Sequence, residues 1–234
     1  MALSGGILIV GSLLWDERRK AWRESRLDMN SSQLVTAPIR YGRQAASRGK
    51  TYTMVFSNGC QAGQAKVVPY AHSVDSAADL ITGAEHLWGA ERNAAPGECL
   101  SAAWGCVALL CNPDKPMAEQ VLNGWRTRLS KERNYGNLPQ PDGEGCLVST
   151  DGILQIGWPK YAGDQSAVAI DFLLATATSP TLAEGKYPTS EAIANVWNED
   201  TGHHVQYFWK NRDNNIWTFE DDEIIKRLRS RRPH

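Results

Sequence analysis

The feature that most constrains the fold is an unbroken apolar run near the amino terminus, at residues 6–10. A strand with one solvated face alternates apolar and polar residues, whereas this run, Gly-Ile-Leu-Ile-Val, has no polar position. Gly11 and Ser12 follow it directly, and such residues mark a tight turn. The run therefore predicts a first strand that is buried on both faces and ends in a turn.

Further strands and helices are predicted along the chain in mixed order. The predicted strands cover residues 34–41, 51–56, 64–70, 103–111, 146–149, 153–156, 168–176, 205–209 and 216–219, with hairpins around Asp151-Gly152 and around residues 212–215. Helical spacing of apolar residues predicts helices after Asp75, after Pro116, from Thr189 to Trp197 and at the charged carboxyl end. Because the strands and helices do not alternate strictly, the predicted class is α+β with a largely antiparallel or mixed sheet.

Composition limits the classes of protein to which the chain can belong. The 234 residues are 42% apolar and include nine Trp, which is enough for a packed core and excludes intrinsic disorder. The length suggests one large domain or a core domain with an extension. The net charge of −1 gives no electrostatic argument for binding nucleic acid or an anionic membrane, so neither is an expected partner.

The longest apolar stretch also bears on location. Residues 6–15 fall short of the roughly 20 residues that a membrane-spanning helix needs. No Lys or Arg precedes the stretch and a charged segment, residues 16–20, follows it, which is unlike a signal peptide. We therefore expect a cytoplasmic protein. Its five Cys, an odd number without CxxC spacing, are expected to be reduced thiols.

Motifs for cofactors and metals are not found in the sequence. Gly49-Lys50-Thr51 resembles part of a phosphate loop, but Gln44 stands where that loop needs Gly, and a predicted strand follows. No GxGxxG, HExxH or GxSxG occurs, and the adjacent pair His203-His204 does not have the spacing of metal ligands. We therefore predict neither a metal nor a cofactor. A Cys–His nucleophile remains open, since no spacing favours any one pair.

The turn after the first strand is a candidate anion site. Gly11, Ser12, Leu13 and Leu14 leave backbone N–H groups at the strand tip, and Gly11 lets a ligand approach the backbone closely. Such a group of donors suits a carboxylate or a developing oxyanion. An ordinary β-turn is the alternative interpretation.

Glu132 is a candidate general base. The helix after Pro116 carries an apolar stripe, and Glu132 falls within this stripe if the helix reaches that far. A carboxylate on an apolar face has a raised pKa, which suits proton transfer near neutral pH. Arg128 is close enough along the helix to form an ion pair that would cancel the effect, and the sequence leaves both alternatives open.

The order of these motifs resembles the gamma-glutamylcyclotransferase-like superfamily. The resemblance covers about residues 6–160: a buried strand, then Gly11-Ser12-Leu13, later Ala-Trp-Gly-Cys at 103–106, and Glu132 shortly before Tyr135. Val10 stands where the family usually has Tyr. The resemblance implies a small mixed β-barrel flanked by helices over residues 1–160. Residues 161–234 would then be a C-terminal extension that packs on the core or completes it.

The resemblance also implies an activity. It is the cleavage of a γ-glutamyl amine or peptide by intramolecular aminolysis, which releases 5-oxoproline without a metal or cofactor. Glu132 would be the general acid/base, Gly11 to Leu14 would hold the substrate carboxylate, and Tyr135 and Arg43 would contact the substrate. The alternatives are a non-catalytic member that binds a small carboxylate or a protein, and a thiol-dependent amidohydrolase. The extension could also bind a protein partner.

Overall fold

A computed structural model describes residues 2–45, 51–97, 99–143, 145–199 and 203–229. The strands are β1 (Gly5–Ile9), β2 (Gln33–Ala45), β3 (Thr51–Phe56), β4 (Ala62–Pro69), β5 (Ser101–Ala102), β6 (Gly105–Cys111), β7 (Lys160–Tyr161) and β8 (Phe172–Thr178). The helices are α1 (Lys20–Arg26), α2 (Ala77–Arg92), α3 (Glu119–Leu129), α4 (Ser190–Glu199), α5 (His203–Asp213) and α6 (Asp221–Arg227), with short 3₁₀ turns η1 (Ser12–Leu14), η2 (Glu17–Arg19) and η3 (Met29–Ser31).

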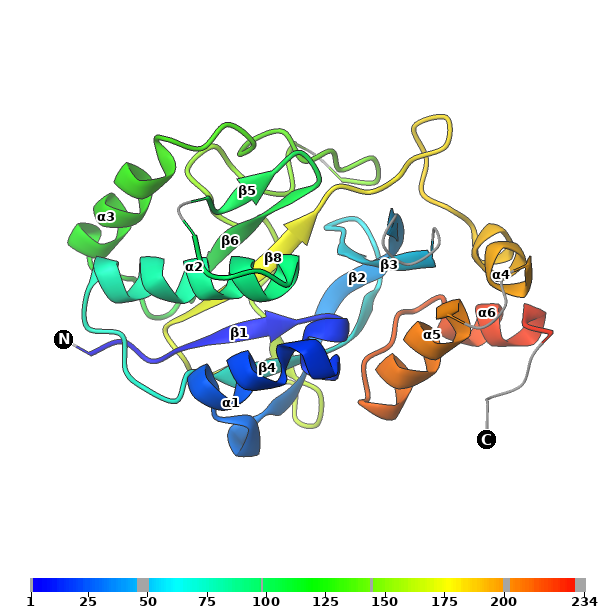
Figure 1. Ribbon diagram of the computed structural model, residues 1–234, viewed down its shortest axis with the longest axis horizontal. Coiled ribbons are helices and arrows are strands. Elements are labelled where there is room, and N and C mark those ends of the chain that lie inside the picture. The colour runs from blue at the N-terminus through cyan, green and yellow to red at the C-terminus, as the bar shows by residue number, and fades with distance from the viewer. Residues whose placement is uncertain (1, 46–50, 98, 144, 200–202, 230–234) are drawn as a thin grey trace.

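The first strand lies in the middle of the sheet. All five residues of β1 are buried, and β1 pairs antiparallel with β4 on one side and parallel with β8 on the other. The described strands form one eight-stranded sheet in the order β3-β2-β4-β1-β8-β6-β5, with β7 added to β2 (Figure 1). This arrangement confirms the prediction of a buried first strand.

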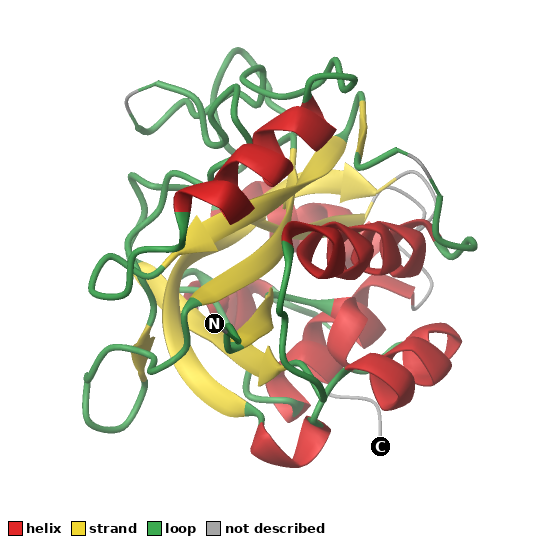
Figure 2. Cartoon of the chain, turned by 90° about the vertical axis from the view of Figure 1, so that its left-hand side faces the viewer, coloured by secondary structure: helices red, strands yellow, loops and turns green. Residues whose placement is uncertain are grey.

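The sheet combines antiparallel and parallel pairs and is accompanied by helices, which confirms the predicted α+β class with a mixed sheet. Figure 2 shows the twisted strands with helices packed around them. The strand order ends at β3 on one side and at β5 on the other, so the described sheet is open. A closed barrel is therefore not confirmed.

The part of the chain after residue 160 contributes a central strand. Every residue of β8 is buried, and β8 lies between β1 and β6. It pairs with β6 over seven residue pairs, from Gly105↔Thr178 to Cys111↔Phe172. A strand surrounded in this way is part of the main core rather than an attached element.

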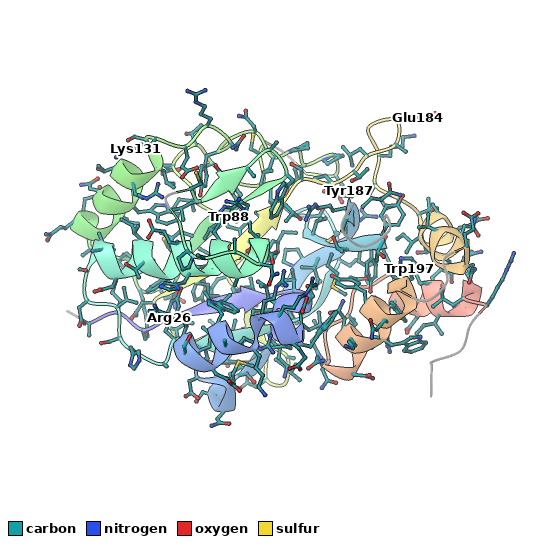
Figure 3. The ribbon with its side chains drawn as sticks, viewed as in Figure 1. Arg26, Trp88, Lys131, Glu184, Tyr187 and Trp197 are labelled. Atoms are coloured by element: carbon teal, nitrogen blue, oxygen red, sulfur yellow. The ribbon has the colours of Figure 1, made fainter. Side chains whose placement is uncertain are left out.

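Helices α4, α5 and α6 form a group beside β2 and β3 (Figure 1). Their core is aromatic: Trp197 of α4 packs edge-on against Tyr41 of β2, with ring centroids 5.1 Å apart. Phe208 of α5 lies 5.2 Å from Trp197. Figure 3 shows Trp197 within this group, whereas Trp88 belongs to α2.

Two local predictions in the second half of the chain are confirmed. Thr189 caps α4, since its hydroxyl oxygen accepts a hydrogen bond from the N–H of Ala192 at 3.1 Å. The hairpin at Asp151-Gly152 forms with an antiparallel bridge between Val148 and Leu154, and Gly152 has φ +78°, a conformation that glycine adopts without strain.

The second predicted hairpin is wrong, because residues 205–209 belong to helix α5. The aromatic run suggested a strand, but the buried positions are Tyr207, Phe208 and Asn211, which share one face of a helix.

The structure also starts α3 at Glu119, three residues after Pro116, and ends it at Leu129, before Glu132. In the described part of the chain, no helix has the length and apolar character needed to span a membrane.

Replacing Trp197 by Ala is expected to lower the free energy of unfolding by about 3–5 kcal/mol, because it leaves a cavity among Tyr41 and Phe208. The matched control is Trp217→Ala, since Trp217 is 38% exposed, and its cost is expected to be about 1 kcal/mol or less. Urea unfolding followed by circular dichroism measures both. Because β8 is central, one transition is expected, and a two-step curve would contradict this.

Candidate functional site

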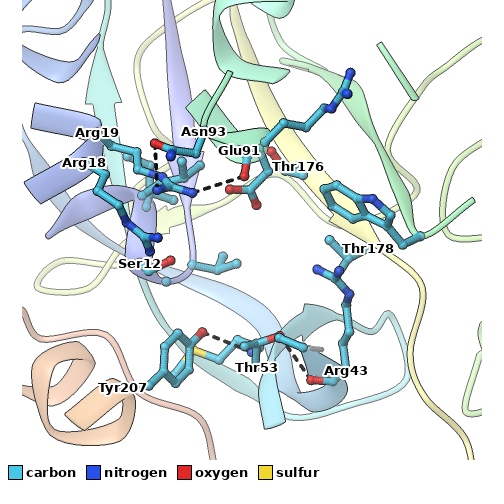
Figure 4. A pocket seen from close by; sticks show the side chains of 18 of the residues that line it. Ser12, Arg18, Arg19, Arg43, Thr53, Glu91, Asn93, Thr176, Thr178 and Tyr207 are labelled. Atoms are coloured by element: carbon cyan, nitrogen blue, oxygen red, sulfur yellow. Dashed lines mark hydrogen bonds between the residues drawn. The ribbon is translucent and has the colours of Figure 1, made fainter. Parts of the chain in front are cut away.

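A cavity of about 640 Å³ opens at the carboxyl end of β1. Its described polar lining comes from the β1 tip and from η2, β2, β3, α2, β8 and α5. These residues are Ser12, Arg18, Arg19, Arg43, Thr53, Glu91, Arg92, Asn93, Thr176, Thr178 and Tyr207. Figure 4 shows Arg18, Arg19 and Ser12 on one side of the cavity and Arg43 on the other. Segments from both ends of the chain therefore meet at one site.

The turn after β1 forms one edge of this cavity. Gly11, Ser12 and Leu13 line it, whereas Leu14 is buried, does not line it, and donates its N–H to the carbonyl of Gly11 at 3.1 Å. The Leu14 N–H therefore closes the turn and is not available to a ligand. A Cβ atom on Gly11 would lie 2.7 Å from the hydroxyl oxygen of Tyr207, so a larger residue here would have to move the Tyr207 side chain.

A buried arginine holds the turn in place. Arg23 of α1 donates from one guanidinium nitrogen to the carbonyls of Leu13 and Asp16, both at 2.9 Å. These carbonyls face the protein interior, where an unpaired polar group would be costly. Arg23 thus connects the first helix to the cavity edge.

Asp16 connects the turn to the arginines beside it. Its carboxylate pairs with Arg18 at 2.7 Å and with Arg19 at 3.4 Å. Burial raises the pKa of Asp16, but the hydrogen bonds from Arg18 and the charge of Arg19 outweigh it and hold the pKa at about 2. Arg19 in turn donates to the carbonyl oxygen of Glu91 and to the Asn93 side chain, both at 3.3 Å, which joins η2 to the end of α2.

Arg43 differs from these arginines in its surroundings. Its guanidinium lies 4.4 Å from the ring centroid of Trp104, whose other neighbour is Trp88, stacked at 4.8 Å. None of the described residues gives the Arg43 guanidinium a hydrogen bond or an ion pair. Burial lowers the pKa of Arg43, and the nearby charge of Glu91 offsets part of this effect. A half-buried cation without a hydrogen-bonded anion favours an anionic ligand.

Two other groups on the cavity wall were not suggested by the sequence. Glu91, in the last turn of α2, is the one carboxylic acid among the described lining residues. Thr176 of β8 has a buried hydroxyl for which the described residues provide no hydrogen-bond partner. In Figure 4 both lie on the same side of the cavity. Thr176 reaches the site through the place of β8 in the strand order, and Glu91 reaches it because α2 packs on β6 and β8.

The structure brings together part of the predicted site. Gly11, Ser12 and Leu13 of the predicted anion site line the cavity at the tip of β1, and so does Arg43, the predicted substrate contact. Glu132 and Tyr135 do not line it. Tyr135 is buried, and its hydroxyl donates to the carbonyl of Val107 at 2.6 Å.

Glu132 lies just beyond α3, with its side chain only 7% exposed. Its carboxylate accepts hydrogen bonds from the Leu100 N–H at 2.8 Å and the Ser101 hydroxyl at 2.5 Å. It also forms the ion pair with Arg128 that the sequence left open, at 3.2 Å. These three donors tie the end of α3 to β5, so the observed role of Glu132 is to join two elements.

Three of the described thiols, Cys60, Cys106 and Cys111, have the opposite of the character that a nucleophile needs. Burial raises the pKa of Cys60 and of Cys106 to about 12, and the pKa of Cys111 to about 11. The hydrogen bonds of the described residues include none between Cys and His; the side chains of His203 and His204 lie outside the described part. Within the described ranges, no group of three or more His, Cys, Asp or Glu could hold a metal ion.

Fold and site together define an α+β protein with an arginine-rich cavity at the tip of a central strand. No family model, no curated protein and no solved structure matches the chain. The function is therefore argued from the chemistry of the site.

Replacing Asp16 by Asn is expected to lower stability by about 2 kcal/mol at pH 7, because the pKa of Asp16 falls from 3.8 to about 2 on folding. A depressed carboxyl pKa stabilises the fold above pH 3.8, and this contribution is lost as the pH falls through about 2. Urea titrations measure the free energy of unfolding of both proteins. The difference between wild type and Asp16→Asn should therefore shrink as the pH falls from 3.8 to about 2.

The matched control is Asp114→Asn, since Asp114 is exposed and the described contacts of its side chain include no ion pair. This substitution is expected to change stability by about 0.5 kcal/mol or less at every pH. An Asp16→Asn difference that stays constant down to pH 2 would contradict the role of the carboxylate charge.

Proposed function

We propose that the protein binds a small organic ligand through a carboxylate group that pairs with Arg43 in the cavity at the tip of β1. The observation that carries the proposal is the half-buried Arg43 guanidinium, which no described residue satisfies with a hydrogen bond or ion pair. A guanidinium offers a planar set of donors that matches both oxygens of a carboxylate. Binding would supply the charge partner that this side chain lacks.

The surroundings of Arg43 support this assignment. Stacking of Trp104 between Arg43 and Trp88 restricts the guanidinium to one orientation, which reduces the entropy lost on binding. The Thr178 hydroxyl and the turn at Ser12 line the same cavity and add polar groups for the ligand. The charge of Glu91 acts on Arg43 and raises its pKa. A second carboxylate group of the ligand, placed beside the first, would therefore be repelled by Glu91.

Replacing Arg43 by Gln is expected to weaken binding by about 10- to 100-fold, because charge-assisted hydrogen bonds are lost. Isothermal titration with glutamate, γ-glutamyl peptides, 5-oxoproline and short aliphatic carboxylates measures the change. Arg133→Gln is the matched control, since Arg133 is exposed and does not line the cavity, and it should bind like wild type. Equal affinities of wild type and Arg43→Gln would contradict the proposal.

A second candidate function is cleavage of a γ-glutamyl amide, and the position of Glu91 in the same cavity favours it. In this reaction the substrate α-amine attacks the γ-carbonyl, the amide C–N bond breaks, and 5-oxoproline and an amine leave. Glu91 would accept the proton of the attacking ammonium and pass it to the leaving amine. The open, twisted sheet would then be a variant of the barrel implied by the superfamily resemblance.

Glu91→Gln and Glu132→Gln separate the two candidate bases. Glu91→Gln is expected to lower kcat for 5-oxoproline release by about 100-fold or more, because the amide cannot accept the proton. Glu132→Gln is expected to lower the Tm and to keep kcat within a few-fold, because it breaks the ion pair with Arg128 outside the cavity.

The opposite result, with kcat lost only in Glu132→Gln, would identify Glu132 as the base. No release by wild type would contradict the catalytic candidate and leave carboxylate binding as the function. A thiol-dependent reaction is not favoured by any observation on the described thiols, whose shifted pKa values are raised. Cytoplasmic location and a protein partner for residues 161–234 stay predictions.

A further inference from the structure

The cavity at the tip of β1 carries more positive charge than one carboxylate can neutralise. The described cations that line it are Arg18, Arg19, Arg43 and Arg92, whereas Glu91 is the one described acid in the lining. Asp16 does not line the cavity but pairs with Arg18 and Arg19. Two acids therefore face four guanidinium groups, although the chain as a whole has a net charge of −1. Such a local excess favours a ligand that carries more than one negative charge.

Arg18 is held in place and is also accessible. Its Nε and Nη2 atoms donate to the two carboxylate oxygens of Asp16, at 3.0 and 2.7 Å. Because the pKa of Asp16 is held at about 2, this ion pair persists at neutral pH. The described contacts of the Arg18 side chain do not include its Nη1 atom, and the side chain is 60% exposed. A guanidinium held along one edge can still donate from another edge to a second anion.

Arg18 also lies where two cavities meet. It lines the cavity at the tip of β1 and a second cavity of about 340 Å³, and the two cavities share Arg19 and Asn93 as well. Beyond Arg18 the second cavity is lined by Trp22 and by small residues at and after the end of α2. An anion at Arg18 therefore has space beside it, so acids of more than one length can reach this position.

The guanidinium groups of Arg18 and Arg43 lie on opposite sides of the first cavity. Figure 4 shows Arg18 beside Ser12 on one side and Arg43 on the other. Glu91 disfavours a second carboxylate next to the one on Arg43, but not one on the far side. We infer that Arg18 forms a second anion subsite, so that the ligand is an elongated dicarboxylate with one end on Arg43 and the other on Arg18. A cavity of about 640 Å³ has room for it, since pockets of this size enclose whole drug-sized molecules.

This inference rests on the proposed function, and it is tested with pairs of acids that differ in the second carboxylate. Full-length wild type is titrated calorimetrically near neutral pH with diacids from succinate to suberate and with the monoacids of equal carbon number, from butyrate to octanoate. At the best-fitting length the diacid should bind about tenfold more tightly than its monoacid, or better. Arg18→Gln should reduce this ratio to about twofold, the statistical advantage of a ligand with two equivalent ends.

Lys20→Gln is the matched control. Lys20 is 59% exposed, belongs to an ion pair as Arg18 does, and lines neither cavity, so this variant should keep the wild-type ratio. Arg18→Lys keeps the positive charge and should retain most of the preference for the diacid. If Arg18→Lys loses the preference as completely as Arg18→Gln, or if Arg18→Gln keeps it, the charge at this position is not the cause and the inference is overturned.

The titrations of wild type and Arg43→Gln separate this inference from the proposed function without any change at Arg18. If diacids and monoacids bind wild type equally at every length and Arg43→Gln weakens both, carboxylate binding stands and the second subsite is overturned. If neither class of acid binds wild type, the proposed function fails and the second subsite fails with it.

Discussion

The structure depends on the complete burial of β1. A strand with both faces and both edges covered needs backbone partners on each side, and here β4 supplies one and β8 the other. Pairing with β8 draws a segment more than 160 residues away into the centre of the sheet. The carboxyl end of β1 is then surrounded by several elements, and the cavity forms where the chain leaves this strand.

Charge is distributed unevenly around that cavity. Arg23 donates to two carbonyls of the turn, and Arg18 and Arg19 share the carboxylate of Asp16, so these three side chains are engaged in contacts within the protein. Arg43 instead rests on Trp104, and an aromatic face stabilises a cation without removing its capacity to bind an anion. This contrast makes Arg43 the natural position for a ligand carboxylate.

The two acidic candidates show why linear order along the chain was a poor guide to the site. Glu132 falls on the apolar stripe of the preceding helix, but α3 ends before it, and three donors turn its carboxylate into a link between α3 and β5. Glu91 has no distinctive local pattern, since it lies in an ordinary charged last turn of α2. It lines the cavity because α2 packs against the sheet with its carboxyl end beside the β1 turn.

The sequence by itself determined the buried first strand, the turn at Gly11-Ser12, most of the other strands and helices, and the α+β class. These follow from hydrophobic periodicity and from glycine and proline positions, which act over a few residues. Only the tertiary structure decided that the sheet is open, that residues 205–209 are helical, and that Arg43, Glu91, Thr176 and Tyr207 share one cavity. Such contacts join residues far apart in the chain, and their energies come from packing and strand pairing that no local pattern encodes.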